Sequence, residues 1–162
     1  MTTLNKTVSI PIIICQKCSG TAVAVAAYLQ QHGAMKRAVL LKELTISMKA
    51  IDKALLDLSL IDAVKLNGSN ELIVVNDQHE LQAIPTRYVD LFFNKCLSSS
   101  EMKVLCAVYA LKEKGTVPTL KTVSKFTGMD ASGVSKALKF LARNRIIKST
   151  VHEDAAHYTY SV

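Results

Sequence analysis

The sequence contains no tryptophan, only three prolines and only six glycines among its 162 residues. So few prolines and glycines exclude a collagen-like chain, a low-complexity segment and a long flexible linker. Aromatic residues make up only 6% of the chain, but hydrophobic residues make up 49%, which is enough to build a core. Since domains typically contain about 100–200 residues, we expect one domain or two small ones.

Long hydrophobic runs are also missing. The stretch from Val8 to Cys15 is apolar, but Pro11 interrupts it, and Gln16 and Lys17 separate it from the next apolar stretch. A membrane-spanning helix needs about 20 largely apolar residues. The stretch also has no clear small-residue cleavage site of the kind that a secretory signal requires. We therefore expect a cytoplasmic protein that does not associate with a membrane.

Cysteine is scarce, with four residues at Cys15, Cys18, Cys96 and Cys106. Cys15 and Cys18 have the spacing of a zinc-ligand pair, but a structural zinc site needs a second pair. Nine residues separate Cys96 from Cys106, which is too many for that second pair. The favoured interpretation is four reduced thiols, with Cys106 in the core of a helix. Zinc binding by Cys15 and Cys18 and a disulfide are the alternatives.

Catalytic motifs are absent as well. The chain has no GxxxxGK[ST] loop, no HExxH and no GxSxG, and its four histidines are scattered. His152, Glu153 and His157 flank an expected hairpin tip and carry groups that can hold a metal ion, but surface histidines are the commoner case. We expect no enzymatic activity, no cofactor and no bound metal.

The C-terminal half has a clear succession of elements. Ser98 and Glu101 form the pattern of a capping box, and Gly115 is placed to end the helix that begins there. Thr119 is placed to cap a second helix, and Gly128 to make the turn that follows it. We expect, in order, a helix, a short extended segment, a helix, a tight turn, a helix and a β-hairpin, at residues 98–114, 116–118, 120–127, 128–130, 131–144 and 146–162.

The N-terminal half repeats this order, with helices at residues 21–31, 38–44 and from 48 onward, then a hairpin at 61–76. Asn67 and Gly68 lie between apolar runs and are typical of a hairpin turn. The segment from Ile51 to Leu55 aligns with the segment from Val134 to Leu138. Between the halves, the helical spacing of apolar residues predicts a connector helix at 81–97. The predicted fold class is α+β, mainly α with small β-hairpins.

The C-terminal succession resembles the winged helix-turn-helix domain. The resemblance rests on the Gly128 turn, on the stripe of Val134, Leu138 and Leu141, and on the Ile146-Ile147 pair that follows. It implies two such domains in tandem, at 1–80 and 98–162, joined by the connector helix. In that family the third helix enters the DNA major groove, and the hairpin, or wing, lies along the backbone or the minor groove. The stretch 84–101 is also similar to the lead-in of winged-helix domains in phage and plasmid replication proteins.

Positive charge lies mainly in the second half. The net charge is +7, with 9 Lys+Arg and 8 Asp+Glu in residues 1–90 but 11 and 5 in residues 91–162. Lysine and arginine contact phosphates, and serine, lysine and arginine read base edges. For base reading we predict Ser132, Ser135, Lys136 and Lys139. For phosphate contact we predict Lys121, Lys125, Arg143, Arg145 and Lys148. A second DNA-binding or partner-binding face is expected at Lys36, Arg37, Lys42, Lys49 and Lys53.

These patterns together predict a sequence-specific protein that binds double-stranded DNA, most simply a transcription regulator that places residues 131–144 in the major groove. We expect a homodimer, because one helix reads only a short half-site. The second apolar stripe of the 101–114 helix, or the region of Phe92 and Phe93, is the expected dimer contact. The acidic pair Glu153 and Asp154 at the wing tip would repel phosphate. The alternatives are a phage or plasmid-type replication initiator or loader, and a winged-helix adaptor whose N-terminal domain binds protein.

Overall fold

The structure is a computed structural model that describes residues 6–152 and 157–162. Its elements form an α+β fold in which helices dominate and three small antiparallel sheets have two strands each. None of the helices in the described ranges is long and apolar enough to cross a membrane. The predicted fold class is therefore confirmed at the level of α+β, mainly α with small hairpins.

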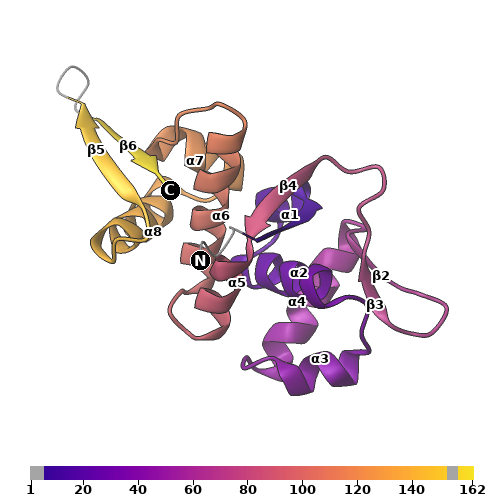
Figure 1. The fold of residues 1–162 in the computed structure, drawn as a ribbon. Helices are drawn as coiled ribbons and strands as arrows, with labels where there is room; N and C mark the ends of the chain where they lie inside the picture. The colour runs from indigo at the N-terminus through magenta and orange to yellow at the C-terminus, as the bar shows by residue number, and fades with distance from the viewer. Residues whose placement is uncertain (1–5, 153–156) are drawn as a thin grey trace.

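The first half begins with a strand and a short helix and then has three longer helices and a hairpin (Figure 1). The bounds are β1 (Thr7–Pro11), α1 (Ile12–Lys17), α2 (Gly20–His32), α3 (Arg37–Glu43), α4 (Met48–Leu60), β2 (Val64–Leu66) and β3 (Leu72–Val74). The rest of the chain has one strand, four helices and a final hairpin. Their bounds are β4 (Leu81–Pro85), α5 (Thr86–Phe93), α6 (Ser99–Glu113), α7 (Leu120–Thr127), α8 (Ala131–Arg143), β5 (Lys148–His152) and β6 (His157–Ser161).

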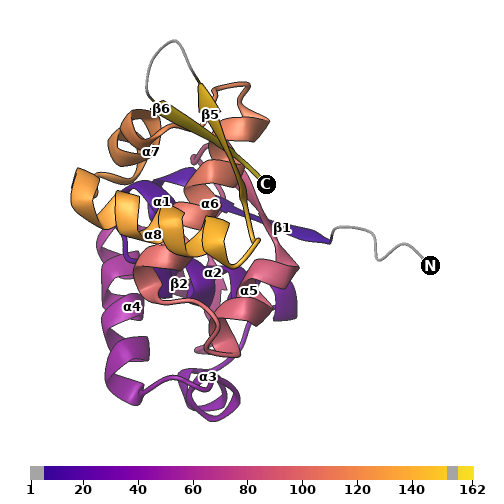
Figure 2. The ribbon, with the colours of Figure 1, turned by 90° about the vertical axis from the view of Figure 1, so that its left-hand side faces the viewer.

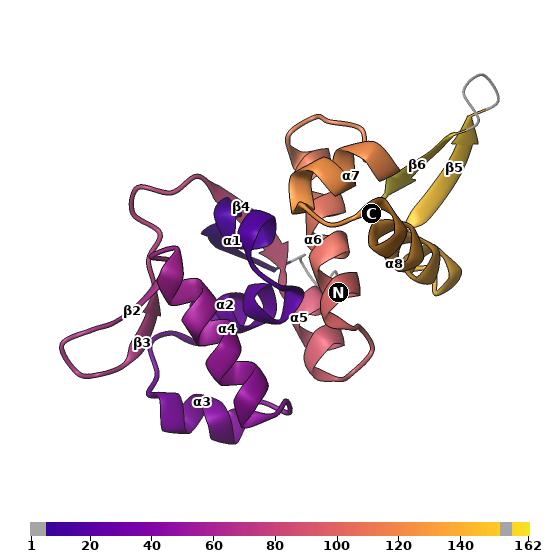
Figure 3. The ribbon, with the colours of Figure 1, turned by 180° about the vertical axis from the view of Figure 1, so that it is seen from behind.

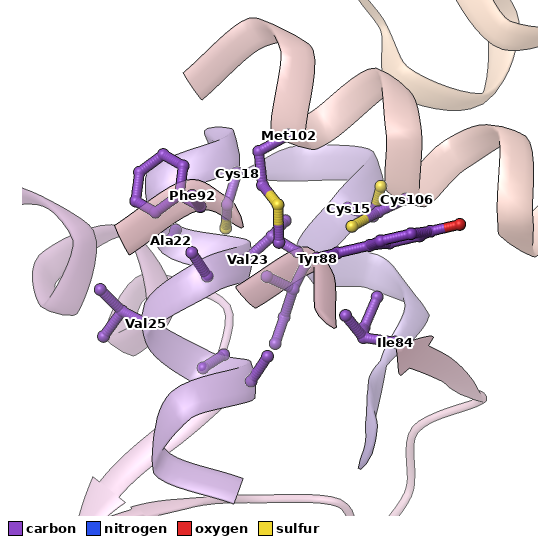
Figure 4. Close-up of a cluster of buried hydrophobic side chains, with 14 of the residues drawn as sticks. Cys15, Cys18, Ala22, Val23, Val25, Ile84, Tyr88, Phe92, Met102 and Cys106 are labelled. Carbon is purple, nitrogen blue, oxygen red and sulfur yellow. The ribbon is translucent and has the colours of Figure 1, made fainter. Parts of the chain in front are cut away.

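Helix α2 lies at the centre of the molecule. Ser19 caps its N-terminus by accepting a hydrogen bond from the N–H of Ala22, and residues 22–27 are all buried. A helix that is apolar on every side needs partners on every side, and α2 packs against α4, α5, α6 and β1. Figure 4 shows this cluster, in which Cys15 from α1 lies beside Cys106 from α6. One continuous core thus joins both halves.

The two halves repeat one arrangement of helices. Helices α3 and α7 begin at Arg37 and Leu120, and α4 and α8 begin at Met48 and Ala131, so both pairs are offset by the same 83 residues. The buried residues match at that offset, as Leu40 with Val123, Ile51 with Val134 and Leu58 with Leu141. The repeated order of elements predicted for the two halves is therefore confirmed.

The hairpins repeat as well. In each half a residue one or two positions before the second helix forms an isolated bridge to the last strand of the hairpin. These bridges are Met35 with Leu72 in the first half and Thr119 with Thr159 in the second. The extended segment predicted at 116–118 thus lies alongside strand β6 of the hairpin, where the N–H of Tyr160 donates to the carbonyl of Pro118.

The connector differs from the prediction. Residues 81–85 form strand β4, and only Thr86–Phe93 are helical. Strand β4 pairs antiparallel with β1, in a register that runs from Thr7 opposite Pro85 to Pro11 opposite Leu81. The helical spacing of Tyr88 and Phe92 correctly indicated α5, but β4 depends on a partner strand far away in the sequence. The N-terminal segment is thereby tied to the connector.

Both surfaces expected to mediate dimerisation are covered by the chain itself. Val104, Val108 and Leu111, the second apolar stripe of α6, are buried, because α6 packs against α2 on one side and α8 on another. Phe92 is also buried, and Phe93 lies edge-on to the ring of Tyr28 at 5.6 Å between centroids. The α6 stripe and Phe92 are therefore packed against neighbouring helices of the same chain, and Phe93 is half-buried.

Candidate nucleic-acid interface

Helices α7 and α8 are held in place by local signals at their ends. Thr119 and Thr122 form a reciprocal capping box at the start of α7, and Gly128 ends α7 in the left-handed conformation with φ of 70°. The carboxylate of Asp130 caps α8 by accepting a hydrogen bond from the N–H of Gly133 at 3.3 Å. The core stripe of α8 faces inward toward α6 and α7. These contacts fix the direction in which the outer face of α8 points.

All seven of the basic residues predicted for this surface are exposed, on α7, α8 and the start of the hairpin. They are Lys121, Lys125, Lys136, Lys139, Arg143, Arg145 and Lys148. Ser132 is exposed too, whereas Ser135 is half-buried. Within residues 6–152 and 157–162, none of the seven makes an ion pair with a carboxylate. The surface therefore carries positive charge that nothing in the described chain neutralises.

A hollow of about 1010 Å³ lies between α7, α8 and the hairpin. In Figure 2, α8 crosses the surface, with α7 and the β5–β6 hairpin above it. The hollow brings together Lys121, Ser135 and Lys139, which were predicted for DNA contact, over an apolar floor that includes Leu138. The hollow is thus lined by the side chains of two lysines, Lys121 and Lys139, and by residues of α8.

Sequence patterns missed several residues that line this hollow. Thr119 and Ser124 reach it from α7, and Ser149 and Tyr160 reach it from the hairpin. The hydroxyl oxygen of Ser124 is buried and has no hydrogen-bond partner in the described part of the chain. Strand alternation indicates that Ser149 faces the opposite side of the hairpin from Lys148 and Thr150. It does not indicate that Ser149 lies near α8, because that depends on how the hairpin packs against the helices.

The basic face predicted in the first half is different in character. Its members are all exposed, and they are Lys36, Arg37, Lys42, Lys49 and Lys53. The guanidinium of Arg37 donates two hydrogen bonds to the carboxylate of Asp52, at 2.8 and 2.7 Å. This pairing lowers the pKa of Asp52 below its ordinary value and holds one positive charge of the face in an ion pair. Ser135, on α8, lies at the position equivalent to Asp52.

The outer surface of the first half is also more apolar. Its exposed large apolar side chains are Val39, Met48, Leu56, Leu60 and Leu66. At an offset of 83 residues the second half has, in the same order, Thr122, Ala131, Lys139, Arg143 and Ser149. The two copies of one fold therefore present different chemistry outward, a basic surface on α8 and a partly apolar surface on α4.

The cysteines are all free thiols. Cys15, Cys18 and Cys106 are buried and Cys96 is exposed, so the predicted place of Cys106 in the core of a helix is confirmed. Burial raises the pKa of Cys15 to about 12 and that of Cys18 to about 11. Their thiol groups point to the carbonyls of Lys103 and Asp57. A thiol held protonated is a poor metal ligand and a poor nucleophile.

The expectations for the wing tip fall outside the described residues, because Glu153 and Asp154 lie in the range 153–156. The backbone register does place His152 opposite His157 across the hairpin. No group of three or more His, Cys, Asp or Glu residues able to hold a metal is found in the described ranges.

Comparisons with family models, with curated proteins and with solved structures found no match to this chain.

Proposed function

We propose that this chain is a sequence-specific double-stranded DNA-binding protein of the winged helix-turn-helix type, acting as a transcription regulator. The observation that supports it most is the outer face of α8. This face carries Ser132, Lys136, Lys139 and Arg143 at helical spacing, all exposed and all without an acidic partner in the described residues. The basic residues of α7 and of the hairpin extend the same surface.

The order of elements supports the family assignment. In each half three successive helices, α2–α4 and α6–α8, lead into a two-stranded hairpin, and in each half a residue ahead of the second of these helices bridges to the hairpin. A short turn with left-handed Gly128 joins α7 to α8, as a helix-turn-helix requires. In such a domain the second helix of the pair presents its outward residues to the major groove.

The dimensions of α8 suit the major groove. Its 13 residues span about 20 Å at 1.5 Å per residue, and a groove about 12 Å wide admits a helix. Ser132, Ser135 and Lys136 lie in the first turns and are placed to reach base edges. Arg143, Arg145 and Lys148 lie at the far end, where the groove wall presents phosphates. The exposed N-terminal turn of α7, with Lys121, adds a phosphate contact on the other side of the hollow.

The first test is binding to DNA fragments selected from a random pool, followed by fluorescence anisotropy at several salt concentrations. If the five basic residues assigned to phosphate contact each neutralise one phosphate, the slope of log affinity against log salt is about −4.5. Lys136→Ala and Lys139→Ala should each weaken specific binding about tenfold or more. Removal of any one cation that binds a phosphate should make the slope shallower by about 0.9.

Lys65→Ala is the matched control, because it removes the same charge from an exposed position on β2 that belongs to neither predicted DNA-binding face. If the double variant of Lys136 and Lys139 binds as well as the Lys65 variant, the assignment of α8 is wrong. Absence of DNA binding even at low salt would overturn the proposal and favour a protein-binding adaptor.

The selected sites also separate the two DNA-directed roles. A regulator that binds as a two-fold dimer selects a palindrome whose half-sites are about 34–36 Å apart or a multiple of that. A replication initiator selects a series of direct repeats. The basic surface of α7 and α8 suits both, and the symmetry of the site decides between them.

A further inference from the structure

The outer face of α4 carries a pattern that DNA binding does not explain. This face, the α4 face, consists of Lys49 and Lys53 in the N-terminal half of the helix and Leu56 and Leu60 in the C-terminal half. Leu56 is 59% exposed and Leu60 is 74% exposed. In Figure 3 the helix runs along the near side of the molecule, with no other helix or strand in front of it. Adjacent exposed leucines on one helix are typical of a protein contact.

The comparison with α8 shows that the apolar half of the face is specific to this helix. Lys53 lies at the position equivalent to Lys136, but Leu56 and Leu60 replace Lys139 and Arg143. Two cations that could contact phosphate are thus exchanged for two side chains that cannot. The N-terminal part of α4 therefore keeps its positive charge, whereas its C-terminal part has apolar side chains in place of cations. This difference disfavours DNA as the partner of the α4 face.

The charges of α4 are arranged against the helix dipole. A helix has partial positive charge at its N-terminus and partial negative charge at its C-terminus. Lys49 lies in the first turn of α4, no acidic residue lies there, and no basic residue lies in the last turn. Asp62, which is exposed, follows just beyond the C-terminus. Each end of α4 therefore needs the charge that the other end carries, which favours pairing with an antiparallel copy of the same helix.

We propose that the α4 face is the contact between two copies of this chain, whose α4 helices pack antiparallel about a two-fold axis. In this arrangement Leu56 of each copy meets Leu60 of the other, and residue 53 of one copy falls opposite residue 63 of the other. Lys53 then lies beside Asp62 of the second copy. The contact is self-complementary, as a two-fold interface must be.

The inference does not use DNA binding, and its test is made without DNA. Sedimentation equilibrium should find the wild-type chain in a monomer–dimer equilibrium. Leu56→Lys and Leu60→Lys should each weaken the dimer by about tenfold or more, because each places a charge at the centre of the contact. Val117→Lys is the matched control: Val117 is 58% exposed and lies in the second half, away from α4, so this change should leave the dimer intact.

A double-mutant cycle tests the antiparallel register. Lys53→Gln and Asp62→Asn should each weaken the dimer, and the double variant should be weakened by less than the two effects combined. Asparagine is chosen because residue 62 has φ of 56°, a conformation that Asn tolerates. Both residues are exposed, so circular dichroism should show unchanged folding.

Several outcomes would overturn the inference. A wild-type chain that is monomeric at every concentration would do so, as would a Leu56→Lys/Leu60→Lys variant that dimerises normally. A dimer that survives these changes while DNA binding falls would make the α4 face a DNA contact. Capture of a different protein by a monomeric chain would make it an adaptor surface.

Discussion

Replacing Gly20 with alanine tests the contact on which the arrangement of the two halves depends. Gly20 is the first residue of α2 and Ser99 is the first residue of α6, so equivalent ends of two equivalent helices meet there. The N–H of Thr21 donates to the hydroxyl oxygen of Ser99 at 3.0 Å. A Cβ at position 20 would lie 1.7 Å from the carbonyl oxygen of Ser99 and 2.9 Å from the backbone nitrogen of Lys103.

The magnitude follows from the kind of atoms involved. Each contacted atom belongs to the backbone of α6, so no side-chain rotation relieves the overlap. Restoring an ordinary contact of at least 3.4 Å requires the two helices to separate. Overpacking of this kind costs about 1–3 kcal/mol or more, and we expect a cost near the upper end of that range. The higher helix propensity of alanine offsets at most about 1 kcal/mol.

The assay is thermal and urea unfolding of the Gly20→Ala variant. A net loss of about 2 kcal/mol lowers the midpoint temperature by roughly 4–8 °C in a chain of this size. Gly68→Ala is the control, because a Cβ there meets no atom within 4 Å and the backbone has no positive φ. If the two variants unfold within about 1 °C of each other, the close approach of α2 to α6 is refuted.

Two further predictions concern ionisable groups. A disulfide reagent should modify only Cys96 rapidly in the native protein and all four thiols after denaturation, because burial raises the pKa of Cys15 to about 12 and of Cys18 to about 11. Burial raises the pKa of Cys15 from its ordinary value of 9.0 to about 12, so the stability that its protonated thiol contributes is lost as pH rises between these two values. A second thiol that reacts rapidly in the native protein would contradict the burial of these cysteines. In an NMR titration Asp52 should ionise below its ordinary pKa of 3.8. Its lowered pKa gives stability above that value, which is lost as pH falls further, and Arg37→Gln should return the pKa toward normal; equal values in both proteins would count against the ion pair.

Much of the local structure could be predicted because short-range rules specify it. Thr119 was predicted as a helix cap, and Ser19, Ser47 and Thr119 each accept a hydrogen bond from the third residue of their helix. The capping box of Ser98 and Glu101 is present. The turn after Asn67 is closed by its own side chain, whose oxygen accepts from the N–H groups of Ser69 and Glu71. Every partner in these motifs lies within four residues.

The β1–β4 pair could not be predicted in the same way. Strand β1 falls in the apolar run from Val8 to Cys15, whose residues suit a strand or a buried helix equally well. Its partner lies more than seventy residues away, as in the pairing of Val8 with Ile84. The strand forms because it satisfies the backbone of β4 and covers α2. No local pattern carries that information.

The candidate site divides along the same line. The basic outer face of α8 was predicted because helical spacing separates Val134, Leu138 and Leu141, which turn inward, from the lysines between them. The ion pair between Arg37 on α3 and Asp52 on α4 was not predicted, because it joins two helices.

Spacing along a helix shows which residues share a side of it. Only the packing of distant segments establishes whether that side is covered. The second stripe of α6 is apolar and buried because α6 also packs against α7 and α8, whereas Leu56 and Leu60 are apolar and exposed because nothing in the described chain covers α4 there. Local sequence therefore specified the helices, their caps and the charge of α8. Tertiary contacts specified which apolar surface belongs to the core and which is left for a partner.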